Sequence, residues 1–139
     1  MAKWVNAVIP MLVCREAEAE IQFCKAAFGA VELHRRPGAD GSVIHPTLKI
    51  ADHLVMIHSE GGHLKSHAEG PDGCSPVVIC VYLEGVDKVI EQAVKAGASI
   101  LLPVEDAFWG DRVGRIVDPA GHVWNVSSRA KGSPLKCRS

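Results

Sequence analysis

The chain repeats one pattern of secondary structure, and this internal repeat constrains its fold more than any other feature. Sliding the sequence along itself aligns Lys25–Ala30 (KAAFGA) with Val94–Ala98 (VKAGA). Each stretch closes a segment with helical apolar spacing, and Gly29 and Gly97 are predicted to end their helices in the left-handed conformation. An apolar strand precedes each helix, and three extended segments follow it. The expected strands are 8–13, 31–36, 43–50 and 54–59 in the first half, and 77–83, 99–104, 112–117 and 123–128 in the second.

Both halves are therefore predicted to be β-α-β-β-β units in the same register. A helix covers one face of such a small sheet and leaves the other face bare, so each unit needs its twin. The predicted fold class is α+β, with two βαβββ modules in tandem inside a single domain, 1–139. We place module one at about 5–59, a linker rich in Gly, His and Ser at 60–75, module two at about 76–129, and a tail without periodicity at 130–139.

Composition narrows the function classes. Lys and Arg number 15 against 16 Asp and Glu, so there is no basic field to attract a nucleic acid. The longest apolar stretches are the size of strands, which argues against a membrane partner. No apolar leader opens the chain, and the cysteine count is odd without a C-x-x-C pair, so we expect reduced thiols and a cytoplasmic location. The cysteines are Cys14, Cys24, Cys74, Cys80 and Cys137.

Four segments carry a resemblance to a known family. They are Ile9–Leu12 (IPML), Phe23–Ala30 (FCKAAFGA), Phe108–Arg115 (FWGDRVGR) and Asp118–Trp124 (DPAGHVW). With them the chain resembles the vicinal oxygen chelate superfamily, also called the glyoxalase/bleomycin resistance protein/dioxygenase superfamily, and most of all its PhnB-like branch. The resemblance implies a half-barrel sheet with helices on its convex side and a ligand cavity on its concave side. It also implies that the enzymes of the superfamily hold a divalent metal on the first and fourth strands of each module.

The positions matched to those metal ligands carry unsuitable side chains here. The match places Asn125 where the metal enzymes carry glutamate, and the repeat places Met56 at the corresponding position of module one. Counting back from the helices gives Ile9 and Val78 on the first strands. Divalent ions prefer carboxylate, imidazole or thiolate ligands, and none of the four side chains is one of these. We therefore expect no metal and no other cofactor; if a metal is found, zinc or another divalent ion is expected.

Histidines leave a displaced metal site open. Hairpin pairing places His45 opposite His58 on the concave face beside Met56. These two rings could bind zinc if His63 or His67 from the linker supplied a third ligand. Alternatively, they are polar residues that line the cavity.

The length of the hairpin loop in module two determines which side chains of the two flanking strands lie on the same face of the sheet. A four-residue loop at Asp118–Gly121 would place Gly114 opposite Asn125 and put Arg112 on the same concave face. Arg112 would then pair with one of the acidic residues nearby or receive an anionic ligand group. The acidic candidates are Glu105, Asp106 and Asp111.

Two tryptophans are predicted to have different roles. Strand parity turns Trp124 toward the helix side, as part of the core, whereas Trp109 lies in a turn where it stacks on a flat ligand or packs against a partner subunit. Asp118 is expected to close its own turn through its side chain, and His122, in the same loop, is expected at the surface.

Three candidate functions are consistent with these residues. The first is metal-independent binding of a small, partly aromatic molecule in an apolar cavity. The second is a metal-dependent enzyme, a glyoxalase-type isomerase or lyase or an extradiol-type dioxygenase, that uses a displaced His-based site; the third is a scaffold whose cavity its own side chains fill. A homodimer is the expected assembly, since open half-barrels leave apolar faces to cover. No catalytic residue is assigned, and the predicted ligand-binding residues are His45, Met56, His58, Trp109, Arg112 and Asn125.

Overall fold

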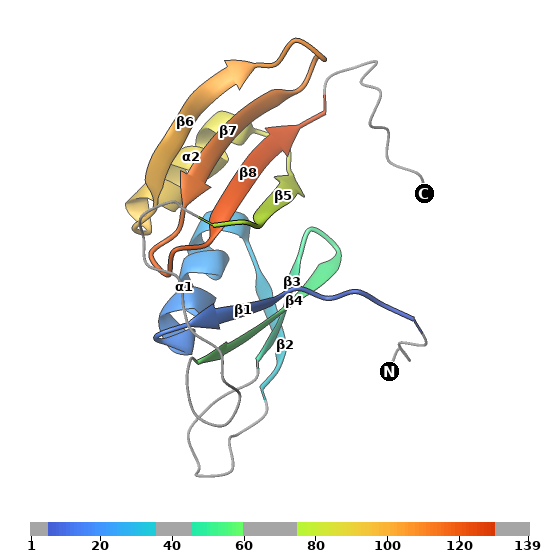
Figure 1. Ribbon diagram of the computed structural model, residues 1–139, viewed down its shortest axis with the longest axis vertical. Coiled ribbons are helices and arrows are strands. Elements are labelled where there is room, and N and C mark those ends of the chain that lie inside the picture. The colour runs from blue at the N-terminus through green and yellow to red at the C-terminus, as the bar shows by residue number, and fades with distance from the viewer. Residues whose placement is uncertain (1–5, 36–45, 60–74, 130–139) are drawn as a thin grey trace.

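The protein consists of two four-stranded sheets, each covered on one face by one helix (Figure 1). The computed structural model describes residues 6–35, 46–59 and 75–129. The predicted tandem βαβββ fold is confirmed within these ranges, while the expected tail and all of the expected linker except its last residue lie outside them. The elements are β1 (Met11–Cys14), α1 (Ala17–Phe28), β2 (Val31–His34), β3 (Thr47–Ile50), β4 (His53–Ser59), β5 (Val78–Tyr82), α2 (Val86–Lys95), β6 (Ser99–Asp106), β7 (Arg112–Val117) and β8 (Val123–Ser128).

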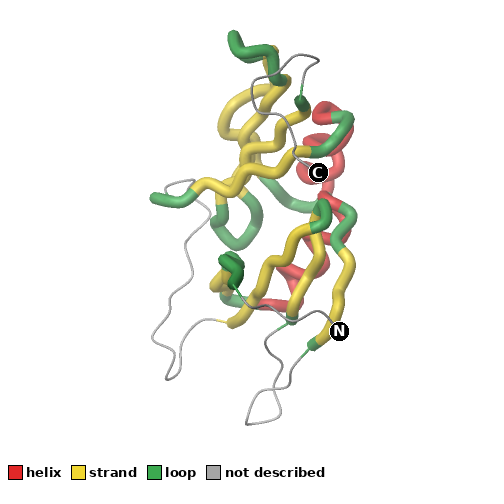
Figure 2. Tube along the Cα trace, turned by 90° about the vertical axis from the view of Figure 1, so that its right-hand side faces the viewer, coloured by secondary structure: helices red, strands yellow, loops and turns green. Residues whose placement is uncertain are grey.

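The two sheets have the same topology. Their strand orders are β1-β4-β3-β2 and β5-β8-β7-β6, with the first strand of each module parallel to the last and every other pair antiparallel. Figure 2 shows the strands and helices of both modules from the side. Within the described residues, neither helix has the length and apolar character needed to cross a membrane.

Both helices end as the repeat predicts. At the end of α1, Gly29 has a φ of 69°, and its amide donates to the Lys25 carbonyl oxygen at 3.1 Å. After α2, Gly97 has a φ of 113°. A Cβ atom at position 97 would lie 3.0 Å from Cγ of Pro119, which is in the turn after β7. The glycine at position 97 therefore also leaves space for that turn.

The modules meet through their helical layers, because α1 contacts α2. The ring of Phe28 lies 4.6 Å from that of Trp124, which is 1% exposed, so the predicted core role of Trp124 is confirmed. His122 was expected at the surface, and this expectation is wrong. It is half-buried, and its Nε2 lies 2.8 Å from the Val13 carbonyl oxygen of the other module.

A buried carboxylate organises the loop beside this contact. Asp118 Oδ1 accepts hydrogen bonds from the amides of Ala120 at 3.0 Å and His122 at 2.9 Å. The predicted role of Asp118 in its own turn is thus confirmed. Its Oδ2 also accepts a hydrogen bond from Trp124 Nε1 at 2.9 Å, which ties the loop to the core.

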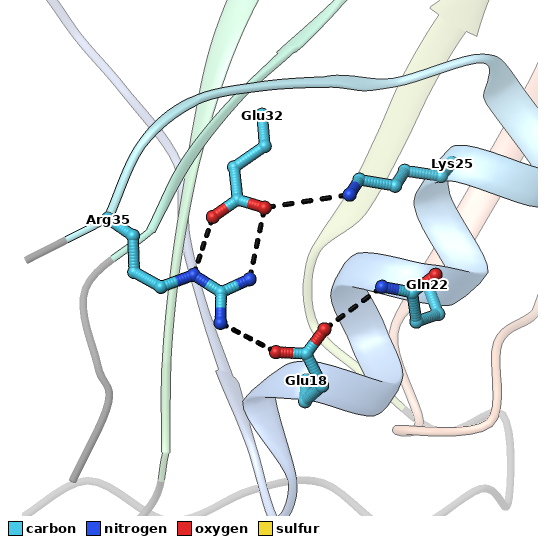
Figure 3. Close-up of polar contacts among 5 residues, drawn as sticks. All are labelled: Glu18, Gln22, Lys25, Glu32 and Arg35. Carbon is cyan, nitrogen blue, oxygen red and sulfur yellow. Dashed lines mark hydrogen bonds and ion pairs between the residues drawn. The ribbon is translucent and has the colours of Figure 1, made fainter.

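An arginine fork fastens the helix of module one to its sheet (Figure 3). Arg35 binds both oxygens of Glu32, at 2.6 and 3.0 Å, and also Glu18 Oε1 at 2.8 Å. Gln22 and Lys25, from the same helix, bind the two carboxylates as well. The bidentate geometry orients the guanidinium plane, so the network fixes the edge strand β2 relative to α1.

Glu20 is a buried acid at the contact between the modules. Its side chain is on α1 and is 2% exposed, and within the described ranges its Oε1 has no hydrogen-bond partner. Burial raises its pKa well above the ordinary value, and the hydrogen bond and negative charge of Asp118 raise it further. Burial therefore favours the protonated form of Glu20 in the folded chain.

We predict that the Glu20→Gln substitution reduces the loss of stability that accompanies a rise in pH. A carboxyl whose pKa is higher in the folded state contributes stability below its unfolded pKa, and this contribution is lost as the pH rises through the folded pKa. The free energy of unfolding of the parent chain should fall over that window, and that of the variant should fall less. Urea titrations between pH 5 and 9 measure this. The control is Glu18→Gln on the same helix, where Gln22 and Arg35 lower the pKa; an equal reduction there would contradict the prediction.

Candidate functional site

The open face of module two, which is the sheet face away from α2, combines residues of β7 and β8. In the observed register Arg115 is opposite Asn125, and Val113 is opposite Ser127. Alternation along the strands then places these four side chains on the open face. Asn125 is on the predicted face, but its neighbour on β7 is Arg115 rather than Gly114.

The placement of Arg112 on this face was wrong, and the reason is the length of one loop. The Asp118 amide donates to the His122 carbonyl oxygen at 2.8 Å, so the loop runs over 118–122 and is one residue longer than expected. A one-residue shift moves every side chain of β7 to the other face. Arg112 consequently lies on the helix side, where it binds Asp87 at 2.8 and 3.0 Å and Asp106 at 2.9 Å.

Arg112 thus forms the second fork of the repeat. The alternative of a structural ion pair is confirmed for Asp106, whereas its main partner Asp87 was missed. Asp87 is the second residue of α2, as Glu18 is the second residue of α1. The internal repeat could therefore have indicated Asp87 as a partner of Arg112, because Glu18 at the equivalent position is a partner of Arg35.

A cavity of about 240 Å³ lies on the open face of module two. It brings together two of the predicted ligand-binding residues, Trp109 and Asn125, with Arg115, which the sequence did not single out. Its walls come from β6, β7, β8 and the turn between β6 and β7. The lining residues are Leu102, Pro103, Glu105, Ala107, Phe108, Trp109, Val113, Gly114, Arg115 and Asn125.

The turn at the edge of this cavity carries two aromatic rings. Phe108 and Trp109 form an edge-to-face pair with centroids 4.9 Å apart. Trp109 is 43% exposed, and its Nε1 donates to Asp111 Oδ2 at 3.2 Å, which fixes the orientation of the indole. An oriented and accessible indole is suited to stacking on a flat molecule.

Arg115 and Asn125 form a hydrogen-bonded polar pair in the lining of the cavity. Arg115 Nε donates to Asn125 Oδ1 at 2.6 Å, and both side chains are half-buried. The pair places a positive charge beside the aromatic turn. The cavity therefore combines apolar walls with few polar groups, which is typical of small-molecule sites.

The predicted site residues of module one lie on the other sheet. Val55 and Ile57 of β4 are in the core, so alternation places Met56 and His58 on the open face of module one. His58 is 3% exposed, and its Nδ1 lies 2.6 Å from the Ser59 carbonyl oxygen. Met56 and His58 therefore lie on a different sheet from Asn125, and on a different module from Trp109. His45, His63 and His67 lie outside the described residues.

The strand register refines the positions matched to metal ligands. Met56 pairs with Met11, and Asn125 pairs with Cys80, each two residues along from the expected Ile9 and Val78. Two thioethers, one thiol and one amide are a poor donor set for a hard or borderline divalent ion. Among the residues in the three described ranges, no three His, Cys, Asp or Glu side chains are grouped to hold a metal.

Comparisons with known proteins agree with this architecture. The profile of the Glyoxalase/Bleomycin resistance protein/Dioxygenase superfamily matches residues 5–126. An uncharacterized protein of Mycobacterium bovis is 40% identical over 135 residues, which are 94% of this chain and 84% of that protein.

Solved structures share the fold at lower identity. TioX from Micromonospora sp. is 24% identical with a TM-score of 0.68, and the match covers 91% of this chain and 98% of TioX. The fosfomycin resistance protein FosX from Listeria monocytogenes, complexed with Mn(II) and sulfate, is 14% identical with a TM-score of 0.64; the match covers 95% of this chain and 98% of FosX.

We predict that Arg112→Met lowers the melting temperature and that about 1 M NaCl removes most of the difference from the parent chain. The Arg112 fork is exposed, and salt screens interactions of exposed charges. Thermal melts at low and high salt measure the effect. Val113→Ala, a neutral change at the next residue, serves as the control, because its effect should not depend on salt. A salt-independent loss for Arg112→Met would mean that the fork contributes packing rather than charge.

Proposed function

Because the chain belongs to the Glyoxalase/Bleomycin resistance protein/Dioxygenase superfamily, we propose that it binds a small, partly aromatic molecule in the module-two cavity without a divalent metal. The observation that carries the proposal is the identity of residue 125 in the lining of this cavity. Asn125 stands where the resemblance expects a metal-binding glutamate, and its Oδ1 is already the acceptor for Arg115. Residue 125 is thus suited to contact an organic ligand rather than to coordinate a metal ion.

The walls of the cavity support the same proposal. Phe108 and Trp109 offer aromatic faces and edges at the rim, and Leu102, Pro103 and Val113 supply apolar area. Burying a flat apolar body against such walls gives most of the binding free energy, while a few polar groups orient it.

The expected homodimer belongs to this proposal. Apolar side chains are exposed on one edge strand of each sheet: Leu33 of β2 is 49% accessible and Leu102 of β6 is 53% accessible. A second copy of the chain would cover this surface and could place the open face of one module against that of another. The assignment to the PhnB-like branch, which rests on the Phe108–Arg115 segment, and the cytoplasmic location are parts of the same proposal.

One observation favours the metal-dependent alternative. His58 is buried on the open face of module one, its Nδ1 lies 2.6 Å from the Ser59 carbonyl oxygen, and imidazole is a common metal ligand. In this alternative, His58 and His45 form a displaced site, and the reaction is a glyoxalase-type isomerisation or an extradiol-type cleavage.

The test combines metal analysis with ligand binding. We expect less than about a tenth of an equivalent of zinc, iron, nickel or manganese in untagged protein purified without chelators. We also expect the neutral probe 2-naphthamide to raise the melting temperature with or without EDTA, because a ligand of the folded state stabilises it.

Two substitutions locate the binding. Trp109→Ala should weaken 2-naphthamide about tenfold, since an aromatic contact is worth about 1 kcal/mol beyond its buried area. Trp109→Phe should retain most of the affinity. Near-stoichiometric metal that His58→Ala removes would overturn the proposal in favour of the enzyme. Absence of any protection by aromatic probes would favour a cavity that the protein's own side chains fill.

A further inference from the structure

We infer that Arg115 is a receptor for an anionic group, so that the ligand class of the module-two cavity is an aromatic monocarboxylate. This inference rests on the proposed function and specifies its ligand. The juxtaposition that carries it is a half-buried guanidinium beside an aromatic turn, held in place by a neutral amide.

The other described arginines are either bound to carboxylates or, like Arg15 and Arg129, exposed. Arg35 binds two carboxylates, and so does Arg112. Arg129 lies over the Tyr82 ring at 4.4 Å. Arg115 is half-buried. In the part of the chain that the structure describes, no carboxylate oxygen lies within 4.0 Å of its guanidinium.

The bond to Asn125 leaves the guanidinium with donors to spare. Nε donates to Asn125 Oδ1 at 2.6 Å, and this bond fixes the plane of the group. A guanidinium has five N–H donors, so the two Nη atoms hold the remaining four. A fixed guanidinium plane matches a carboxylate through two parallel hydrogen bonds, and little entropy is lost when they form.

The charge of the cavity favours one negative charge over two. Among the described residues that line the cavity, Arg115 is the one cationic side chain, and Glu105 belongs to the same lining. A carboxylate ligand gains the attraction of Arg115 and meets modest repulsion from Glu105. A dianion such as a phosphate monoester is attracted more strongly as well, but its second charge has no cation to pair with among the described lining residues and is desolvated beside Glu105.

The size and the walls of the cavity favour an aromatic body. About 240 Å³ is space for a ring system of one or two rings with its carboxylate. With the carboxylate on Arg115, the ring lies toward Phe108 and Trp109, which form the adjoining turn.

The experiment compares three probes with the same ring by calorimetry at pH 7.5. The probes are 2-naphthoate, its neutral counterpart 2-naphthamide and the dianionic 2-naphthyl phosphate. We expect 2-naphthoate to bind about tenfold to a hundredfold more tightly than 2-naphthamide, which is the value of a charge-assisted hydrogen-bonded pair. It should also bind more tightly than 2-naphthyl phosphate.

Four substitutions assign the preference to Arg115. Arg115→Met should abolish the advantage of 2-naphthoate over 2-naphthamide, and Asn125→Asp should do the same by neutralising the guanidinium with a side chain of nearly the same size. Glu105→Gln should strengthen 2-naphthoate and leave 2-naphthamide unchanged. Arg112→Met, on the same strand but on the helix side, is the matched control and should keep the full preference. If Arg115→Met fails to fold, Asn125→Asp decides.

The outcomes separate the inference from the proposed function. Equal affinities of 2-naphthoate and 2-naphthamide in the parent chain, or a preference that survives both Arg115→Met and Asn125→Asp, would overturn the anion receptor and leave the binding cavity intact. The tightest binding by 2-naphthyl phosphate would overturn the monocarboxylate class. Failure of all three probes to bind would overturn both the inference and the proposed function.

Discussion

The closure of one loop by Asp118 decides which side chains reach the cavity. The buried carboxylate accepts two amide hydrogen bonds of its own loop and one from the Trp124 indole, and the Asp118 amide donates to His122. These bonds make the loop one residue longer than a simple Asp-Pro-x-Gly turn. Because faces alternate along a strand, this single residue turns Arg115 toward the cavity and sends Arg112 to the helix side. The chemistry of the open face thus depends on a hydrogen-bonded turn at its far end.

Most of the fold could be predicted from the sequence, since apolar periodicity and turn residues are local signals. The two helices, the strand parity of Trp124 and the turn role of Asp118 follow from such signals. The candidate site was predicted less completely, because it depends on register and on contacts between distant segments. Trp109 and Asn125 do meet in one cavity, whereas Met56 and His58 lie on the other sheet. His122 packs on the other module, and no pattern within its own loop indicates this.

The two arginine forks show what the duplicated module needs in order to hold its shape. Each joins an acidic residue in the first turn of the helix to an acidic residue on a strand of the same sheet, through Arg35 in one module and Arg112 in the other. Arg35 follows β2, whereas Arg112 is the first residue of β7, so the two modules form equivalent ion-pair networks from different positions. On the open faces the halves differ more, with Met56 and His58 on one and Arg115 and Asn125 on the other.

The contact between the modules uses the side of each sheet that faces its helix, through pairs such as Phe28 with Trp124 and His122 with Val13. None of these side chains lines the module-two cavity. Assembly of the chain and the proposed recognition of a ligand therefore depend on separate sets of residues. Substitutions at the cavity can accumulate, and its preference can drift from one molecule to another, while the joint that keeps the two modules together is left untouched.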